Sequence, residues 1–139
     1  ALQHAVITHQ HPVDAFIQEN SSDKEMAAFV MPLAKGFARL QQATAWIGEQ
    51  GLKDIEQAAS AATEFQRMFG IVAIGFMWAR MAKVAQAALA NGTDETEFYE
   101  NKLLTARFYM ERSLPDTSSL LAKLTAGKDT MMAMSADAF

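Results

Sequence analysis

A proline-free stretch from Ile55 to Ala90 is the feature that most constrains the fold of this chain. Asp54 is placed to cap a helix that begins at Ile55, and Gly92 follows as a residue type that commonly ends one. An unbroken helix over this stretch would be roughly 54 Å long. Its apolar side chains fall on two stripes, so we expect a central helix with more than one packing partner. One stripe is Phe65, Phe69, Val72, Phe76 and Ala79, and the other is Met68, Ile71, Gly75, Trp78 and Ala82.

Composition also favours helices. Alanine occurs 26 times and methionine nine times among the 139 residues, whereas proline occurs only three times. Alanine and methionine are strong helix formers, and scarce proline leaves long segments uninterrupted. A chain of this length suits one domain and can bury a core without a disulfide or a metal. The predicted fold class is therefore all-α.

A helix from about Asp23 to Glu49 is expected before the central one. Ser22 and Glu25 form a capping-box pattern at its start, and Gly48 and Gly51 are expected to close it. Pro32 predicts a kink, or a start nearer to the proline. Apolar residues with alternating spacings of four and three give this segment the pattern of a bundle seam. They are Met26, Val30, Leu33, Phe37, Leu40, Thr44 and Ile47.

Two shorter helices are expected after the turn at residues 91–93. The third helix begins within residues 94–100, a stretch rich in Asp and Glu, and ends before Pro115. Asp116 is expected to cap a fourth helix, which Gly127 terminates. The chain is thus predicted to be an up-and-down four-helix bundle with one long central helix. Gly70 and Gly75 are the places where that helix could bend.

The two ends of the chain fit this bundle less well. Val13, Phe16 and Ile17 could form a short helix after Pro12, and residues 128–139 could add one more turn. We expect residues 1–22 to be a poorly defined segment, which could be the end of a preceding domain. Residues 23–139 are expected to form a C-terminal helical-bundle domain.

Charge and apolar runs argue against several classes of partner. The net charge of −4, from 16 acidic and 12 basic residues, argues against a nucleic-acid surface. The longest uncharged apolar run covers residues 68–79, whereas a membrane span needs about 20 residues, so no span is expected. The first twenty residues lack the features of a signal peptide. The absence of cysteine excludes disulfide and thiolate chemistry and fits a cytoplasmic protein.

The sequence assembles no catalytic or metal-binding set of residues. The histidines, His4, His9 and His11, all precede the four main predicted helices, so no inward Glu-x-x-His pair and no Ser–His–acid set arises there. The three imidazoles could catch a stray metal, but a solvated segment is the simpler interpretation. The glycines are scattered, so no phosphate-binding loop exists, and residues 94–100 lack the EF-hand spacing. We predict no catalytic, cofactor-binding or metal-binding residue in this chain.

Basic residues beside the apolar stretches have two interpretations. Arg67, Arg80 and Lys83 flank the central helix, and further basic residues mark the third helix (Lys102, Arg107 and Arg112). The commoner outcome is a solvated face with pairs between helices. The other is that the arginines dock on another domain or subunit. Nothing in these residues alone reveals an activity.

Three segments together resemble the C-terminal helical region of the larger type of bacterial acyl-CoA dehydrogenase. They are FARLQQATAWIGEQG (Phe37–Gly51), FGIVAIGFMWARMAKVAQAAL (Phe69–Leu89) and FYENKLLTARFYMERSLPDTSSLLAKLTAGKDTMM (Phe98–Met132). The resemblance covers about residues 23–139. It is carried by apolar spacing and a few distinctive residues, namely Trp46, Lys102, Arg107, Tyr109 and Pro115.

The resemblance implies a parent enzyme that oxidises acyl-CoA to 2-enoyl-CoA with FAD as hydride acceptor. The glutamate base and the flavin contacts of that family belong to the preceding catalytic core, so no catalytic residue is carried over to this chain. The domain itself is expected to bind no FAD and to pack against that core or another subunit of a homo-oligomer. The alternative is a free-standing helical-bundle interaction module with no enzymatic activity, because composition and periodicity suit it equally well.

Overall fold

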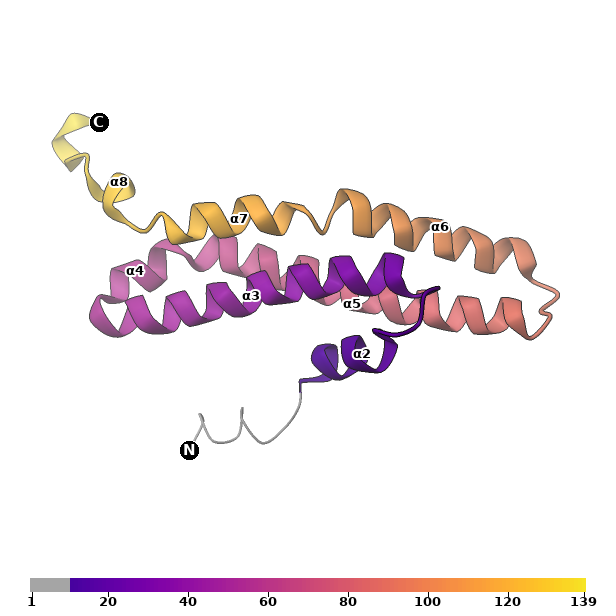
Figure 1. The fold of residues 1–139 in the computed structure, drawn as a ribbon. Coiled ribbons are helices and arrows are strands. Elements are labelled where there is room, and N and C mark those ends of the chain that lie inside the picture. Colours follow the sequence, from indigo (N-terminus) through magenta and orange to yellow (C-terminus); the bar gives the residue numbers. More distant parts are fainter. Residues whose placement is uncertain (1–10) are drawn as a thin grey trace.

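The computed structural model describes residues 11–139, and every regular element among them is helical (Figure 1). This confirms the all-α prediction. The elements are α2 (Pro12–Asn20), α3 (Ala27–Lys53), α4 (Ile55–Ser60), α5 (Ala62–Ala90), α6 (Thr96–Arg112), α7 (Asp116–Thr125), α8 (Asp129–Met132) and a 3-10 turn, η1 (Ala136–Ala138).

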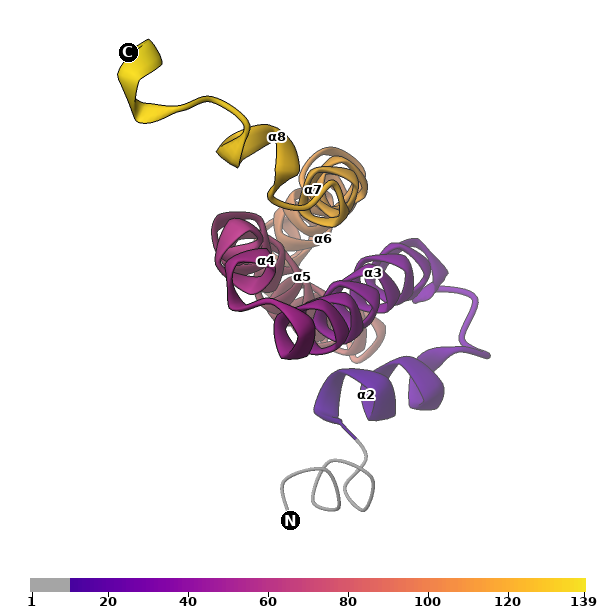
Figure 2. The same cartoon turned by 90° about the vertical axis from the view of Figure 1, so that its left-hand side faces the viewer.

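The four long helices, α3, α5, α6 and α7, form three parallel rods. Figure 1 shows α6 and α7 lying end to end along one side, so that together they form the third rod beside α3 and α5. The end-on view places α7 in front of α6 in the same line (Figure 2). The four predicted long helices, with a long central one, are confirmed, but the fourth continues along the line of the third instead of reversing beside it. Pro115 interrupts the third rod because it removes a backbone donor without forcing the chain to reverse.

The start and end of α3 differ from the predicted boundaries. The helix begins at Ala27, in agreement with the alternative of a start nearer to Pro32. The Asp23 carboxylate accepts the Glu25 amide at 2.9 Å and holds the residues before Ala27 in a turn. The predicted Ser22–Glu25 capping box is therefore wrong. The helix also continues through Gly48 and Gly51 to Lys53, so these glycines do not close it.

The second predicted helix is divided at Ala61 rather than bent at a glycine. Asp54 caps its first part, α4, by accepting the Glu56 amide at 3.0 Å, as predicted. The Ser60 hydroxyl donates to the Gln57 carbonyl at 2.7 Å just before the break, and α5 then runs through both Gly70 and Gly75.

Glycines in the left-handed region end both α5 and α7. Gly92 and Gly127 each have a φ of 77°, a conformation that residues with a Cβ rarely adopt, and both were predicted as helix stops. Asp116 is the first residue of α7 and makes no cap bond, so the predicted cap is wrong. The expected extra turn near the C-terminus is present as α8.

The N-terminal segment contains the expected short helix. α2 begins at Pro12 and packs against α3, with Val13 buried and the half-buried Phe16 and Ile17 packed on the core. Figures 1 and 2 place α2 on the outside of the bundle. The division of the chain into residues 1–22 and 23–139 stays a prediction.

The predicted bundle seam of α3 does not stay on the buried side of the helix. Its first five residues, from Met26 to Leu40, are buried, but the sixth, Thr44, is exposed, and the neighbouring Ala43 is buried instead. An α-helix has about 3.6 residues per turn, so a strict alternation of four and three slips around its surface. The Thr44 hydroxyl donates to the Leu40 carbonyl at 2.8 Å instead of entering the core.

Helix α5 is the central helix of the bundle, as predicted, and packs against α3, α6 and α7. Its buried residues are Met68, Val72, Gly75, Ala79, Ala82 and Ala85. Phe69, expected on a core stripe, is 58% exposed instead. By length and composition alone α5 could also cross a membrane, a test that the core helix of a soluble protein passes as well.

Leu114 is the contact at which the three rods meet. It follows α6, is 1% exposed, and inserts its side chain between Gly36 of α3 and Gly75 of α5. A Cβ at Gly75 would lie 2.9 Å from Leu114 Cδ1, and one at Gly36 would overlap Leu114 Cδ2 even more closely. Both helices therefore need glycine here to leave room for the leucine.

Alanine should have opposite effects at two helical glycines. We expect Gly36→Ala to lower the free energy of unfolding by about 1–3 kcal/mol, because the added methyl overlaps Leu114 in a packed core. At Gly70 no atom lies within 4 Å of a new Cβ, so Gly70→Ala should raise the free energy by about 0.5–1 kcal/mol. Urea unfolding of both variants measures the two signs, and equal effects would contradict this packing.

Candidate functional site

The most unusual surface of the structure is the side of α5 that faces away from the core. Ile74, Met77, Met81 and Val84 form a row there, the α5 stripe, and are between 39% and 63% exposed. The side of α5 that faces the core carries mostly alanine and glycine in the same part of the helix. The larger apolar side chains therefore point outward, although burial would stabilise them most.

A groove of about 700 Å³ runs beside the C-terminal half of this stripe, and we call it the α5 groove. Met77, Met81 and Val84 form its floor. Phe16 from α2 contributes to one wall, where its ring meets Phe76 edge-on at 5.6 Å between centroids. The other wall comes from α6, through Phe98, Tyr99 and Lys102.

The polar groups around the α5 groove are cationic. Arg80, Lys83 and Lys102 line it together with the apolar residues, and no carboxylate does so in the part of the chain that the structure describes. Lys83 Nζ donates to the buried Asn20 Oδ1 at 2.5 Å, so its position is fixed by α2.

All three of these cations lie against aromatic rings rather than carboxylates. Arg80 is 5.6 Å from the Phe76 centroid, and Lys102 Nζ is 5.2 Å from that of Phe98. Lys83 Nζ is 5.9 Å from the Phe16 centroid. Among residues 11–139, none of the three forms an ion pair. Their positive charges are therefore available to an anionic partner.

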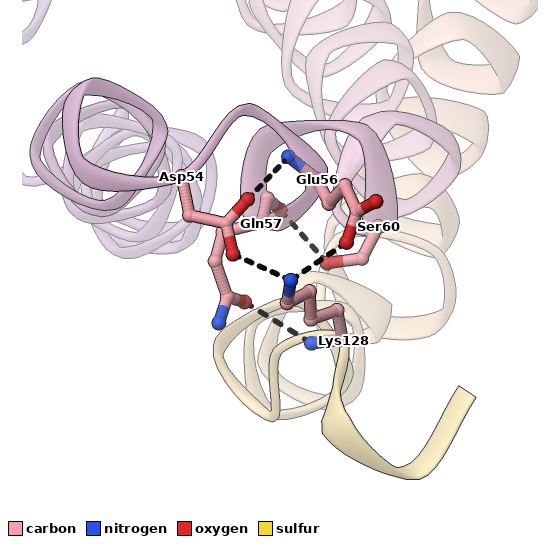
Figure 3. Close-up of polar contacts among 5 residues, drawn as sticks. All are labelled: Asp54, Glu56, Gln57, Ser60 and Lys128. Carbon is pink, nitrogen blue, oxygen red and sulfur yellow. Dashed lines mark hydrogen bonds and ion pairs between the residues drawn. The ribbon is translucent and has the colours of Figure 1, made fainter. Parts of the chain in front are cut away.

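A second polar feature fixes the C-terminal segment to the opposite end of the bundle. Figure 3 shows Lys128 reaching the corner between α3 and α4, where its ammonium lies 2.5 Å from Asp54 Oδ2 and 2.6 Å from Glu56 Oε2. The Lys128 amide also donates to Gln57 Oε1 at 3.1 Å. Gln57 therefore binds the C-terminal segment through its side-chain oxygen.

Charge and hydrogen bonding shift the pKa values at this corner in opposite directions. The Lys128 hydrogen bond and the Glu56 amide lower the pKa of the Asp54 carboxyl, because both stabilise its ionised form. The two carboxylates raise the pKa of the Lys128 ammonium for the same reason, with the Asp54 hydrogen bond first. The corner is thus a charge-assisted junction in solvent contact, and it sets where α8 leaves the bundle.

The segment beyond this junction extends away from the bundle and is apolar. Figures 1 and 2 show it projecting past the end of α7. Met131, Met132, Met134 and Phe139 are all at least 60% exposed. The sequence contained these methionines, but nothing local to them indicated that they would remain uncovered.

The candidate residues considered from the sequence do not meet at one site. His4 and His9 lie outside the described residues, and His11 caps α2 through its Nδ1, which accepts the Val13 amide at 3.2 Å. Within residues 11–139, no group of three His, Asp or Glu side chains could hold a metal ion. The acidic residues 94–100 surround the start of α6.

Sequence reasoning missed the α5 stripe and the junction at Lys128. The stripe has a sequence signal, since positions 74, 77, 81 and 84 repeat with spacings of three, four and three. The ion pairs of Lys128 have none, because their acidic partners lie more than 70 positions earlier in the chain.

Replacing Lys128 should loosen the junction without disturbing the bundle. In Lys128→Gln the ammonium is lost, so we expect the residue-128 amide to exchange faster with solvent, while buried amides of α5 keep their protection. NMR-detected hydrogen exchange measures both. Lys123→Gln, at an exposed lysine of α7 without an ion pair among the described residues, is the control and should change neither.

The Asp54 charge should stabilise the fold only above acidic pH. Because the folded-state pKa is lowered from 3.8, the ionised form is favoured by folding, and this contribution is lost as the pH falls through the folded pKa. Asp54→Asn keeps a good helix cap but removes the charge. Urea unfolding should show the variant to be less stable than wild type near neutral pH and equal to it well below pH 3.8. A difference that does not depend on pH would refute this account.

Comparison with known proteins identifies the family. A family model described as "Acetyl-CoA dehydrogenase C-terminal like" matches residues 10–135. No curated protein matches the sequence. The matched range includes α2 to α8, so it covers the α5 stripe, both walls of the groove and the Lys128 junction. The chain therefore belongs to the acetyl-CoA dehydrogenase C-terminal-like family.

Proposed function

We propose that this chain is the non-catalytic C-terminal domain of an FAD-dependent acyl-CoA dehydrogenase, and that it packs against the catalytic core or another subunit. Its family is associated with such enzymes. The observation that carries the docking role is the α5 stripe, because a row of large apolar side chains on the outside of a central helix is favourable only when covered. The projecting apolar segment after Lys128 is a second surface of the same kind.

The residues that line the α5 groove do not fit a flavin. The α5 groove is lined by the interiors of α2 and α5 and by the first turns of α6, and its charged groups are two lysines and an arginine without a glycine-rich turn. A pyrophosphate is usually held by free backbone N–H groups at such a turn, whereas the groove residues of α2 and α5 lie inside helices, where these groups are already bonded. We propose that FAD and the acyl-CoA substrate bind in the preceding core, and that this domain contributes packing and assembly in a cytoplasmic homo-oligomer.

The size of the native gene product tests the parent enzyme first. We expect a polypeptide several times heavier than 15.3 kDa that carries flavin absorbance and reduces a dye with acyl-CoA. Mass spectrometry and an absorbance spectrum of the protein purified from its source measure both. A native product of about this mass would refute the proposal and favour the free-standing interaction module.

Deletion tests the role of the domain within that enzyme. Removing residues 10–135 from the parent should dissociate the oligomer or strongly reduce activity, because an apolar surface on its partner would be uncovered. Removing residues 133–139 alone separates the two surfaces, since it takes away Met134 and Phe139 of the projecting segment but leaves the α5 stripe and the Lys128 junction in place. Sedimentation and turnover that are unchanged by the larger deletion would refute the docking role.

A further inference from the structure

We propose that the α5 groove binds an amphipathic α-helix whose apolar stripe is edged by carboxylates. The inference rests on the proposed docking role and specifies the partner's surface: one helix, with acidic residues beside its apolar face.

The spacing of the α5 stripe identifies the partner's shape. Ile74, Met77, Met81 and Val84 follow the three–four repeat with which one helix packs along another at a shallow angle. Phe16 of α2 and Phe98 of α6 also line the groove, so the partner would contact side chains of three helices. The two methionines suit such a site because their flexible side chains adapt to the ridges of the incoming helix.

The charge of the groove identifies the partner's edges. Arg80, Lys83 and Lys102 line it, and α5 carries no carboxylate after Glu64. The whole chain is acidic, so this concentration of positive charge is a local feature. Carboxylates on both edges of a bound helix would face these cations, which favours association and suppresses partners of the wrong charge.

A second copy of the chain does not fit the same groove. In a two-fold dimer each surface meets itself, so the cations of both copies would lie in one interface. Two hollow surfaces also leave space between them when they face each other. Like charge and shape both disfavour self-association through this groove.

A membrane surface is disfavoured by the shape of the site. A helix that lies in a bilayer interface must present its apolar side chains as the outermost atoms. Here Phe16 of α2 and Phe98 of α6 line the site together with the α5 methionines, so the apolar surface is a groove shared by three helices rather than the outermost face of one helix.

Peptide binding to the full 139-residue chain tests the inference. The probes are two synthetic helical peptides with the same leucine stripe, one with glutamate and one with lysine at every edge position. Fluorescence anisotropy should show the glutamate peptide binding roughly tenfold more tightly. Equal affinities, or no binding of the glutamate peptide below about 1 mM, would overturn the proposal.

Two double variants assign the binding to the groove. Met77→Gln/Met81→Gln removes the apolar floor and should weaken the glutamate peptide by roughly tenfold. Its control is Leu104→Gln/Phe108→Gln, which replaces two large apolar side chains of α6 that are 67% and 63% exposed and lie outside the groove. Equal losses in both variants would mean nonspecific apolar binding and would overturn the assignment. Circular dichroism checks that all variants remain folded.

Charge reversal separates the edges from the floor. Arg80→Glu/Lys102→Glu should abolish or invert the preference for the glutamate peptide, and it leaves the Lys83–Asn20 hydrogen bond intact. Lys24→Glu/Arg112→Glu makes the same change in net charge at exposed positions outside the groove and should keep the preference. A preference that survives the first variant would overturn the role of these cations.

Two further measurements address the other occupants. If the chain dimerises and Met77→Gln/Met81→Gln abolishes the dimer, a second copy fills the groove. If the chain binds vesicles of anionic phospholipid more strongly than the peptide, and the same variant loses this binding, the groove is a membrane site. Either result overturns the proposal. Peptide binding is measured on this chain alone and does not depend on the parent enzyme. A parent enzyme that is unchanged by the domain deletion would refute the docking role. The preference of the groove for an acidic helix could still be measured.

Discussion

The packing of Leu114 between two glycines determines the arrangement of the bundle. This leucine lies at the break between α6 and α7 and contacts α3 and α5 at the positions where each lacks a side chain. Close approach of three rods at one point leaves little space for larger residues, and the penalty for overpacking is steep in a dense interior. Polar contacts then add to this arrangement. The Tyr109 hydroxyl donates to the Ile71 carbonyl at 2.8 Å, and Arg39 donates to Thr117 Oγ1 at 3.1 Å.

The same requirement for close approach explains the composition of α5. Alanine and glycine occupy much of its inner side, which lets the neighbouring helices come near, and the larger apolar residues are left for the outer side. An isolated bundle gains nothing from large apolar residues in water. The helix is therefore organised for two contacts: one made within the chain, and one that the proposed partner would supply.

Local signals predicted the fold well, and long-range contacts explain what they missed. Asp54, Gly92, Pro115 and Gly127 mark helix ends through chemistry that acts within a few residues, so their positions could be inferred from the sequence. The capping box at Ser22 failed because Asp23 offers a competing acceptor one residue later. The sequence also could not tell which side of α5 would be covered, because periodicity identifies a stripe but not its partner. The groove and the Lys128 junction arise from residues brought together only by folding, and so had no local signature.

The interruption at Pro115 preserves the rotational phase of the third rod. Its buried residues continue from α6 into α7 with helical spacing, namely Ala106, Met110, Leu114, Thr117, Leu120 and Leu124. The turn at residues 113–115 thus acts as a spacer of fixed length. One residue inserted there would rotate α7 by about 100° about its axis and carry Leu120 and Leu124 away from the core. The number of residues in this turn is therefore as strictly constrained as the identity of any side chain in the core.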